Sequence, residues 1–127
     1  MTTSTETVRQ FYAALGSGDA PGALGLMAAD IEWNTMWHYK VEGLGPQKVA
    51  EGLLMPLMKE WKEFKLVATE FVTEGDTVVS LGRFTGTHGT TGKVADAGYA
   101  HVWNVANGRI TRFRQFIDTL AVAEARK

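Results

Sequence analysis

The chain has no cysteine, few prolines and no long apolar run, and each of these absences excludes a class of protein. Its 127 residues include 0 Cys and 3 Pro. Without cysteine there is no disulfide, no thiolate nucleophile and no cysteine-based metal site. No stretch approaches the ~18 apolar residues of a membrane span, and the start, MTTSTETVRQ, lacks the basic and apolar segments of a secretory leader. We therefore expect a soluble, cytoplasmic protein with no membrane partner.

A strong charge of either sign is also missing. The 13 Lys and Arg residues nearly balance the 14 Asp and Glu residues, which gives a formal charge of −1. No basic stripe is available to follow a phosphate backbone, so nucleic acid is not an expected partner. The three histidines show no His-x-x-x-His or Glu-x-x-His spacing, and the carboxylates do not cluster. We therefore expect no metal and no other cofactor.

Helical patterns occupy the first half of the chain. Thr3 with Glu6 forms a capping-box pattern ahead of an apolar stripe, and Asp19 caps a short second helix that has Pro21 in its first turn. Residues 30–39 are predicted to form a strand. Pro46 opens a third helix, which Pro56 should kink or end.

Alternating patterns fill the second half. Strands are predicted at 63–73, 77–88, 95–105 and 109–118. Asn107-Gly108 joins the last two and is the strongest short hairpin signal that a sequence offers. Helices followed by an antiparallel meander predict an α+β fold, and residues 1–127 are expected to form a single domain.

A two-residue turn at Asn107-Gly108 places Ala106 opposite Arg109 and sets the register of the final hairpin. One face then pairs Tyr99 with Phe116, His101 with Arg114, Trp103 with Arg112 and Val105 with Ile110. The other face pairs Gly98 with Ile117, Ala100 with Gln115, Val102 with Phe113 and Asn104 with Thr111.

The uncharged second face suits either a packed core or the wall of an apolar cavity, and we predict that it is the pocket face. The first face mixes aromatic rings with arginines and is predicted to be a homodimer surface. Its residues are Tyr99, His101, Trp103, Arg112 and Arg114. The alternative is an ordinary exposed sheet face on which the arginine stems cover the rings.

Three stretches together resemble one family. They are VRQFYAALGSGDAPGALGLMAADIEW, VEGLGPQKV and AHVWNVANGRITRFRQFID. Over nearly the whole chain, this pattern is similar to SnoaL-like, ketosteroid-isomerase-related proteins of the nuclear-transport-factor-2-like superfamily. The resemblance implies a cone-shaped fold, in which three N-terminal helices pack on a strongly curved, mainly antiparallel sheet around an apolar pocket. It also implies dimers formed through the outer face of the sheet.

The catalytic residues of two related enzyme groups are absent at the matching positions. For the ketosteroid isomerases, the resemblance places Phe11 and Ala100 where a tyrosine and a protonated aspartic acid belong, and Thr35 or Asn34 where the base belongs. For limonene-epoxide hydrolase, it places Gly82, Phe84 and Gln115 at an Asp-Arg-Asp set. SnoaL-like cyclases use a carboxylate near the end of the final strand, for which Asp118 is the nearby candidate.

The site residues expected from these arguments fall into two groups. The catalytic candidates are Gln115, Asp118 and His38, with Asp118 requiring a bulge to turn inward. The ligand-contacting candidates are Phe11, Leu15, Trp33, Thr35, Trp37, Leu54, Ala100, Val102, Phe113 and Ile117. Against these roles, Trp33 and Trp37 can equally fill a core, and Gln115 can simply bond to backbone.

Three hypotheses about function remain open. The first is a cofactor-free proton-transfer enzyme (an isomerase, cyclase, dehydratase or hydrolase) acting on a small apolar, ring-bearing substrate. The second is a module that binds such a ligand without turning it over, which the vacant catalytic positions favour. The third is an interaction domain whose cavity is filled by its own aromatic side chains.

Overall fold

The first two helices form at the predicted caps in the computed structural model, which describes residues 3–127. They are α1 (Ser4–Gly16) and α2 (Ala20–Leu24). The Thr3 side chain accepts the backbone N–H of Glu6, and the Asp19 carboxylate accepts that of Gly22. Each cap provides a partner for an N–H that has none inside its helix.

The third helical segment contains a π-helical turn that the sequence patterns did not predict. It consists of α3 (Pro46–Val49), the π turn η1 (Ala50–Leu54) and α4 (Met55–Glu60). Pro56 has no N–H to give to the carbonyl of Gly52, as an α-helix would require. The turn widens just before the proline, and the helix continues to its last residue instead of breaking.

A five-stranded sheet forms the other layer. Its strands are β1 (Met27–Asn34), β2 (Trp61–Glu74), β3 (Thr77–His88), β4 (Val94–Ala106) and β5 (Arg109–Ile117). They lie in the order β1-β5-β4-β3-β2, with β1 parallel to β5 and the other pairs antiparallel. The first strand starts earlier than predicted and ends at Asn34, although the alternation of buried and exposed side chains continues to Tyr39.

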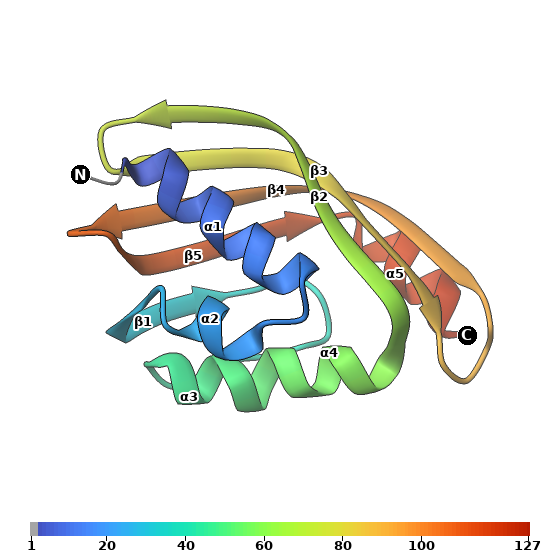
Figure 1. Ribbon diagram of the computed structural model, residues 1–127. Helices are drawn as coiled ribbons and strands as arrows, with labels where there is room; N and C mark the ends of the chain where they lie inside the picture. The colour runs from blue at the N-terminus through green and yellow to red at the C-terminus, as the bar shows by residue number, and fades with distance from the viewer. Residues whose placement is uncertain (1–2) are drawn as a thin grey trace.

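The sheet bends strongly and wraps around α1, as Figure 1 shows. A Cβ atom at Gly82 on β3 would lie 2.1 Å from the Val67 carbonyl oxygen and 2.6 Å from the Tyr99 hydroxyl, so glycine is needed for this close approach. A C-terminal helix, α5 (Thr119–Arg126), packs against β4 at the end of the molecule far from the N-terminus. The patterns did not predict this helix. The α+β class and the cone-like arrangement of helices on a curved sheet are confirmed.

The final hairpin turns as predicted, but its register shifts after two residue pairs. Asn107 and Gly108 both have positive φ, as a two-residue turn of this type needs. Val105 faces Ile110, but Asn104 then faces Arg112, which leaves Thr111 as an extra residue on β5. Such a bulge exchanges the two sides of a strand relative to its partner.

The predicted faces of β4 are therefore wrong, while those of β5 hold from Arg112 onward. Ile110, which was predicted on the outer face, is buried. Beyond the bulge, Trp103 lies opposite Phe113 and His101 opposite Gln115. The aromatic members of the predicted dimer surface point into the core: Tyr99, His101 and Trp103 are at most 5 % exposed. That surface cannot form as predicted.

Candidate functional site

A small cavity, which we call the inner cavity, lies between α1, the π turn and the concave face of the sheet. Its volume is about 20 Å³, which is room for one water molecule. Its lining residues are Phe11, Tyr12, Leu15, Trp33, Trp37, Leu53, Leu54, Leu57, Leu66, His101, Trp103, Phe113 and Gln115. The rings fill most of the space. Trp33 stacks on Phe113 with ring centroids 3.9 Å apart.

Some of the predicted ligand-contacting residues line this cavity, and others do not. Those that line it are Phe11, Leu15, Trp33, Trp37, Leu54 and Phe113, together with the catalytic candidate Gln115. The hydroxyl of Thr35 instead donates to the Tyr39 carbonyl oxygen at 2.5 Å, and Ile117 packs against the core. Ala100 and Val102 lie on the convex face of the sheet because of the bulge, so placing them in the pocket was wrong.

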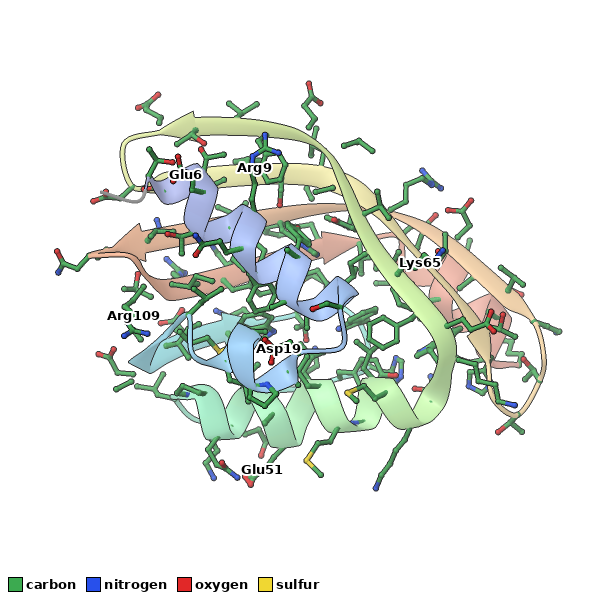
Figure 2. All side chains as sticks on the ribbon, in the orientation of Figure 1. Glu6, Arg9, Asp19, Glu51, Lys65 and Arg109 are labelled. Carbon is green, nitrogen blue, oxygen red and sulfur yellow. The ribbon has the colours of Figure 1, made fainter. Side chains whose placement is uncertain are left out.

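Charged side chains stay away from the inner cavity. In Figure 2, the labelled Glu51 and Arg109 lie toward the edge of the molecule, and both side chains are exposed, as is Lys65. Among the described residues that line the cavity, none carries a carboxylate. Its polar chemistry therefore depends on neutral groups.

His101, which the predicted register placed on the outer face, ends a buried hydrogen-bond chain. Trp103 Nε1 donates to Ser80 Oγ at 2.9 Å. Ser80 Oγ lies 2.8 Å from the Tyr12 hydroxyl, which lies 2.6 Å from His101 Nδ1. The Ser80 hydroxyl accepts from Trp103, and its recorded contact that can accept its own proton is the Tyr12 hydroxyl, so the tyrosine proton goes to Nδ1. This direction gives the Ser80 and Tyr12 protons an acceptor each and leaves the proton of the imidazole on Nε2.

Burial keeps this chain uncharged. His101 is 2 % exposed, and its burial holds the pKa of the imidazole well below its usual range. Burial, followed by the neighbouring Tyr99, raises the pKa of Tyr12 far above that of a free phenol. Tyr99 also stacks on the imidazole at 3.8 Å between ring centroids, which fixes its orientation. Near neutral pH, His101 thus acts as a neutral and rigid N–H donor.

Several buried polar atoms that line the inner cavity have no hydrogen-bond partner. They are Trp33 Nε1, Trp37 Nε1, His101 Nε2 and Gln115 Oε1. A buried polar group without a partner costs about 1–3 kcal/mol, so a native fold rarely gathers several around one space. The arrangement is suited to a molecule that supplies the missing partners.

A larger pocket, which we call the outer pocket, borders the inner cavity. Its volume is about 340 Å³, and it is lined by Leu15, Gly16, Gly18, Ala20, Leu54, Met58, Trp61, Glu63 and Phe64. Leu15 and Leu54 line both spaces and form the boundary between them. Leu15 also borders a third hollow of about 230 Å³ beside β2. Its side chain therefore lies at the junction of the interior and two openings.

Asp118 lies outside the inner cavity, contrary to the catalytic role predicted for it. Its carboxylate accepts the backbone N–H of Ala121 at 3.1 Å and caps α5. The side chain is exposed, since the bulge occurs early in β5 and does not turn the end of the strand inward. The residue is explained by a structural role.

His38, the third catalytic candidate, belongs to a cluster around Glu60 that lies apart from the inner cavity. His38 Nε2 lies 2.7 Å from Oε1 of Glu60, and His88 Nε2 lies 2.9 Å from Oε2. Arg126 Nε donates to Oε2 at 2.7 Å, and the Tyr39 hydroxyl donates to Oε1. The cluster fastens α5 and the segment after β1 to the end of α4.

The Glu60 carboxylate is held ionised by these contacts. Burial alone would raise its pKa, but hydrogen bonds from Tyr39, Arg126, His38 and His88 hold the pKa well below the usual range. Burial, and then Glu60 itself, raises the pKa of Tyr39. Within residues 3–127, no three His, Asp or Glu side chains are grouped so that they could hold a metal ion.

Comparison with known proteins assigns the family. The model of the SnoaL-like domain matches residues 8–113, so the chain belongs to the SnoaL-like domain family. No curated protein sequence matches it significantly. Along residues 3–127, no helix is long and apolar enough to cross a membrane.

Solved structures share the whole fold. An NTF2-like protein from Burkholderia thailandensis is 33 % identical over 100 % of this chain and 99 % of its own, with a TM-score of 0.91. TerC, crystallised with polyporic acid, is 28 % identical over 96 % of both chains, with a TM-score of 0.84. IdmH from Streptomyces antibioticus, a candidate polyketide cyclase, is 18 % identical over 98 % of both chains, with a TM-score of 0.85, and shares the fold alone.

Proposed function

We propose that the inner cavity and the outer pocket together bind a small, apolar, ring-bearing molecule. The observation that carries this proposal is the set of unpaired N–H and C=O groups around one aromatic cavity. The volume of the outer pocket lies within the usual range for ligand sites, and the inner cavity adds polar groups at its end. Polyporic acid in the crystals of TerC supports a ring-bearing ligand as the class to test.

Leu15 is the proposed entrance residue. It lies in the last turn of α1, is half-buried, and separates the inner cavity from two openings. A change of its rotamer needs no movement of backbone, whereas Leu54 is held in the π turn. Ligand entry would therefore proceed by rotation of this one side chain.

A tryptophan-fluorescence titration tests the proposal. The panel comprises a steroid enone, a terpene epoxide, an aromatic polyketide ester and polyporic acid. We expect saturable quenching by at least one compound, weakened in Trp37→Phe and Gln115→Ala but kept in Val102→Ala on the convex face. A flat response to the whole panel by folded protein would refute ligand binding and favour a self-filled core.

We further propose a cofactor-free reaction of the isomerase or cyclase type, because the polar groups suit an enol better than a ketone. A ketone oxygen accepts one hydrogen bond from His101 Nε2–H. Its enol form also donates a proton to Gln115 Oε1, so the enol gains a second bond. A transition state with enol character would share this second bond and be bound more tightly than the ketone, which lowers the barrier. The proton that leaves the α-carbon would pass to the carboxylate of Glu63, which lines the outer pocket. Turnover of an enolisable panel member, lost in His101→Phe, is the expected result.

We also propose that a second copy of the chain covers the convex face of the sheet. Apolar side chains from four strands are exposed there: Val67 and Val72 on β2, Leu81 on β3 and Phe116 on β5, with Ala100 and Val102 on β4 between them. Arg112 and Arg114, which pair with Asn104 and Val102 on β4, would border this patch in the proposed interface. Sedimentation should show a dimer that Phe116→Glu dissociates, and a monomeric wild-type protein at high concentration would refute the proposal.

A further inference from the structure

We infer that the inner cavity recognises a hydroxyl group (phenol, enol or alcohol) at the end of the ligand, in preference to an ether or a ketone. The inference rests on the proposed ligand binding and adds to it the polar chemistry of the ligand. It depends on two side chains that lie directly opposite each other on adjacent strands, His101 on β4 and Gln115 on β5.

The first half of the recognition is a donor. His101 Nδ1 is occupied by Tyr12, so the proton of the neutral imidazole is on Nε2, where it has no partner. The stacked Tyr99 ring, and Phe113 edge-on with centroids 4.8 Å apart, hold the imidazole in place. A fixed N–H donor requires an acceptor atom on the ligand.

The second half is an acceptor. Gln115 is 2 % exposed, and its Oε1 has no hydrogen-bond partner. Gln115 Oε1 requires a donor on the ligand. It therefore disfavours a ligand with an anionic oxygen, although such an oxygen would suit the N–H groups of the cavity. Cross-strand neighbours place their Cβ atoms roughly 5 Å apart, so one small group can reach both side chains. A hydroxyl is such a group, because it accepts and donates through a single oxygen atom.

Size supports the same conclusion. The inner cavity of about 20 Å³ admits a group the size of water but no ring, whereas the outer pocket of about 340 Å³ admits one or two rings. A ligand therefore places its ring beside Leu15 and Leu54 and inserts its hydroxyl beyond them. An ammonium ligand is disfavoured, because the described residues that line the inner cavity include no anion to pair with it.

A matched pair of probes tests the inference by isothermal titration calorimetry. 2-Naphthol and 2-methoxynaphthalene share the same rings, but the methyl ether keeps only the acceptor. We expect the wild-type protein to bind 2-naphthol roughly 3- to 10-fold more tightly, the effect of one net hydrogen bond. In Gln115→Met, which keeps the length of the side chain, this ratio should fall to about one.

Two further variants complete the test. His101→Phe keeps the stacked ring and should weaken both probes, while Val102→Ala on the convex face should change neither affinity. Circular dichroism checks that each variant is folded, and Gln115→Met alone decides the matter if His101→Phe does not fold. Equal affinities in the wild type, or tighter binding of the ether, would overturn the hydroxyl preference while leaving ligand binding intact. Absence of saturable binding by either probe would overturn both proposals.

Discussion

Replacing Glu60 by glutamine should destabilise the protein by about 2–3 kcal/mol. The carboxylate is 20 % exposed and accepts from four donors, Tyr39 and His38 on Oε1 and His88 and Arg126 on Oε2. Glutamine keeps one acceptor oxygen and replaces the other by NH₂, so two of the four bonds are lost. With the NH₂ in the place of Oε2, these are the bonds from His88 and Arg126. A hydrogen bond to a charged group contributes about 1.5–3 kcal/mol, and the value for Arg126 is reduced because its side chain is 40 % exposed.

The loss at Oε2 is aggravated by the fixed tautomer of His88. Its Nδ1 accepts the backbone N–H groups of Thr90 and Thr91 at 3.3 and 3.2 Å, so the proton is on Nε2. In Glu60→Gln, this N–H would face the N–H groups of the amide. For a chain of this size the expected loss corresponds to a decrease of roughly 10 °C in Tm.

The assay is urea unfolding of Glu60→Gln beside a control, Glu51→Gln, whose side chain is exposed on η1. Folding lowers the pKa of Glu60. The contribution of Glu60 to stability is therefore complete above the pKa that its carboxyl has in the unfolded chain, about 4.3. It is lost as the pH falls through the folded-state pKa. The difference from wild type should therefore be constant from about pH 5 to 8 and shrink below that range. A difference under ~0.5 kcal/mol at pH 7, or one that persists unchanged in acid, would refute this reasoning.

Three other variants have distinct expected outcomes. Leu15→Ala should lower the free energy of unfolding by about 1–2 kcal/mol, because the side chain is half-buried. It should also speed the association of 2-naphthol in stopped-flow experiments. An unchanged association rate would contradict the role of Leu15 as the entrance residue. Tyr12→Phe should free Nδ1 of His101 and let both tautomers form, which imidazole ¹⁵N chemical shifts would reveal; an unchanged Nε2–H spectrum would show that another contact sets the tautomer. Asp118→Ala should cost about 1 kcal/mol through the lost cap and leave ligand affinity unchanged, whereas a large loss of affinity would return it to the site.

Local signals in the sequence were sufficient for most of the fold. The caps at Thr3 and Asp19 and the turn at Asn107-Gly108 depend on short-range chemistry that the tertiary structure did not override. The signal for α5 is also local, because Asp118 precedes a run of good helix formers, but the predicted strand includes residue 118 and the patterns assign no element to residues 119–126. The π turn before Pro56 is harder to predict. A proline indicates that the helix is interrupted, but it does not indicate whether the helix kinks, ends or forms a π turn.

The candidate site was only half predictable, and the bulge on β5 is the reason. Periodicity correctly placed Phe113 and Gln115 on the inner side of β5, because that strand carries charge on its other side. On β4 both sides are largely apolar, so periodicity does not distinguish its buried face. No residue near Thr111 indicates a bulge. The predicted faces of β4 therefore depend on the register set by the turn alone. The unbulged register therefore predicts His101 on the surface and gives no reason to group it with Tyr12 and Ser80. The choice between the two faces depends on burying Trp103 and Tyr99, which is a property of the whole core.

The extra residue on β5, Thr111, determines both the lining of the inner cavity and the composition of the convex surface. On one side of β4 it decides which rings line the inner cavity, and on the other it decides which residues form the convex surface. A deletion of this residue would restore the unbulged pairing, in which His101 and Trp103 can no longer face the interior together with Phe113 and Gln115. Gain or loss of one residue in this hairpin would therefore change the lining of the inner cavity and the composition of the convex surface together.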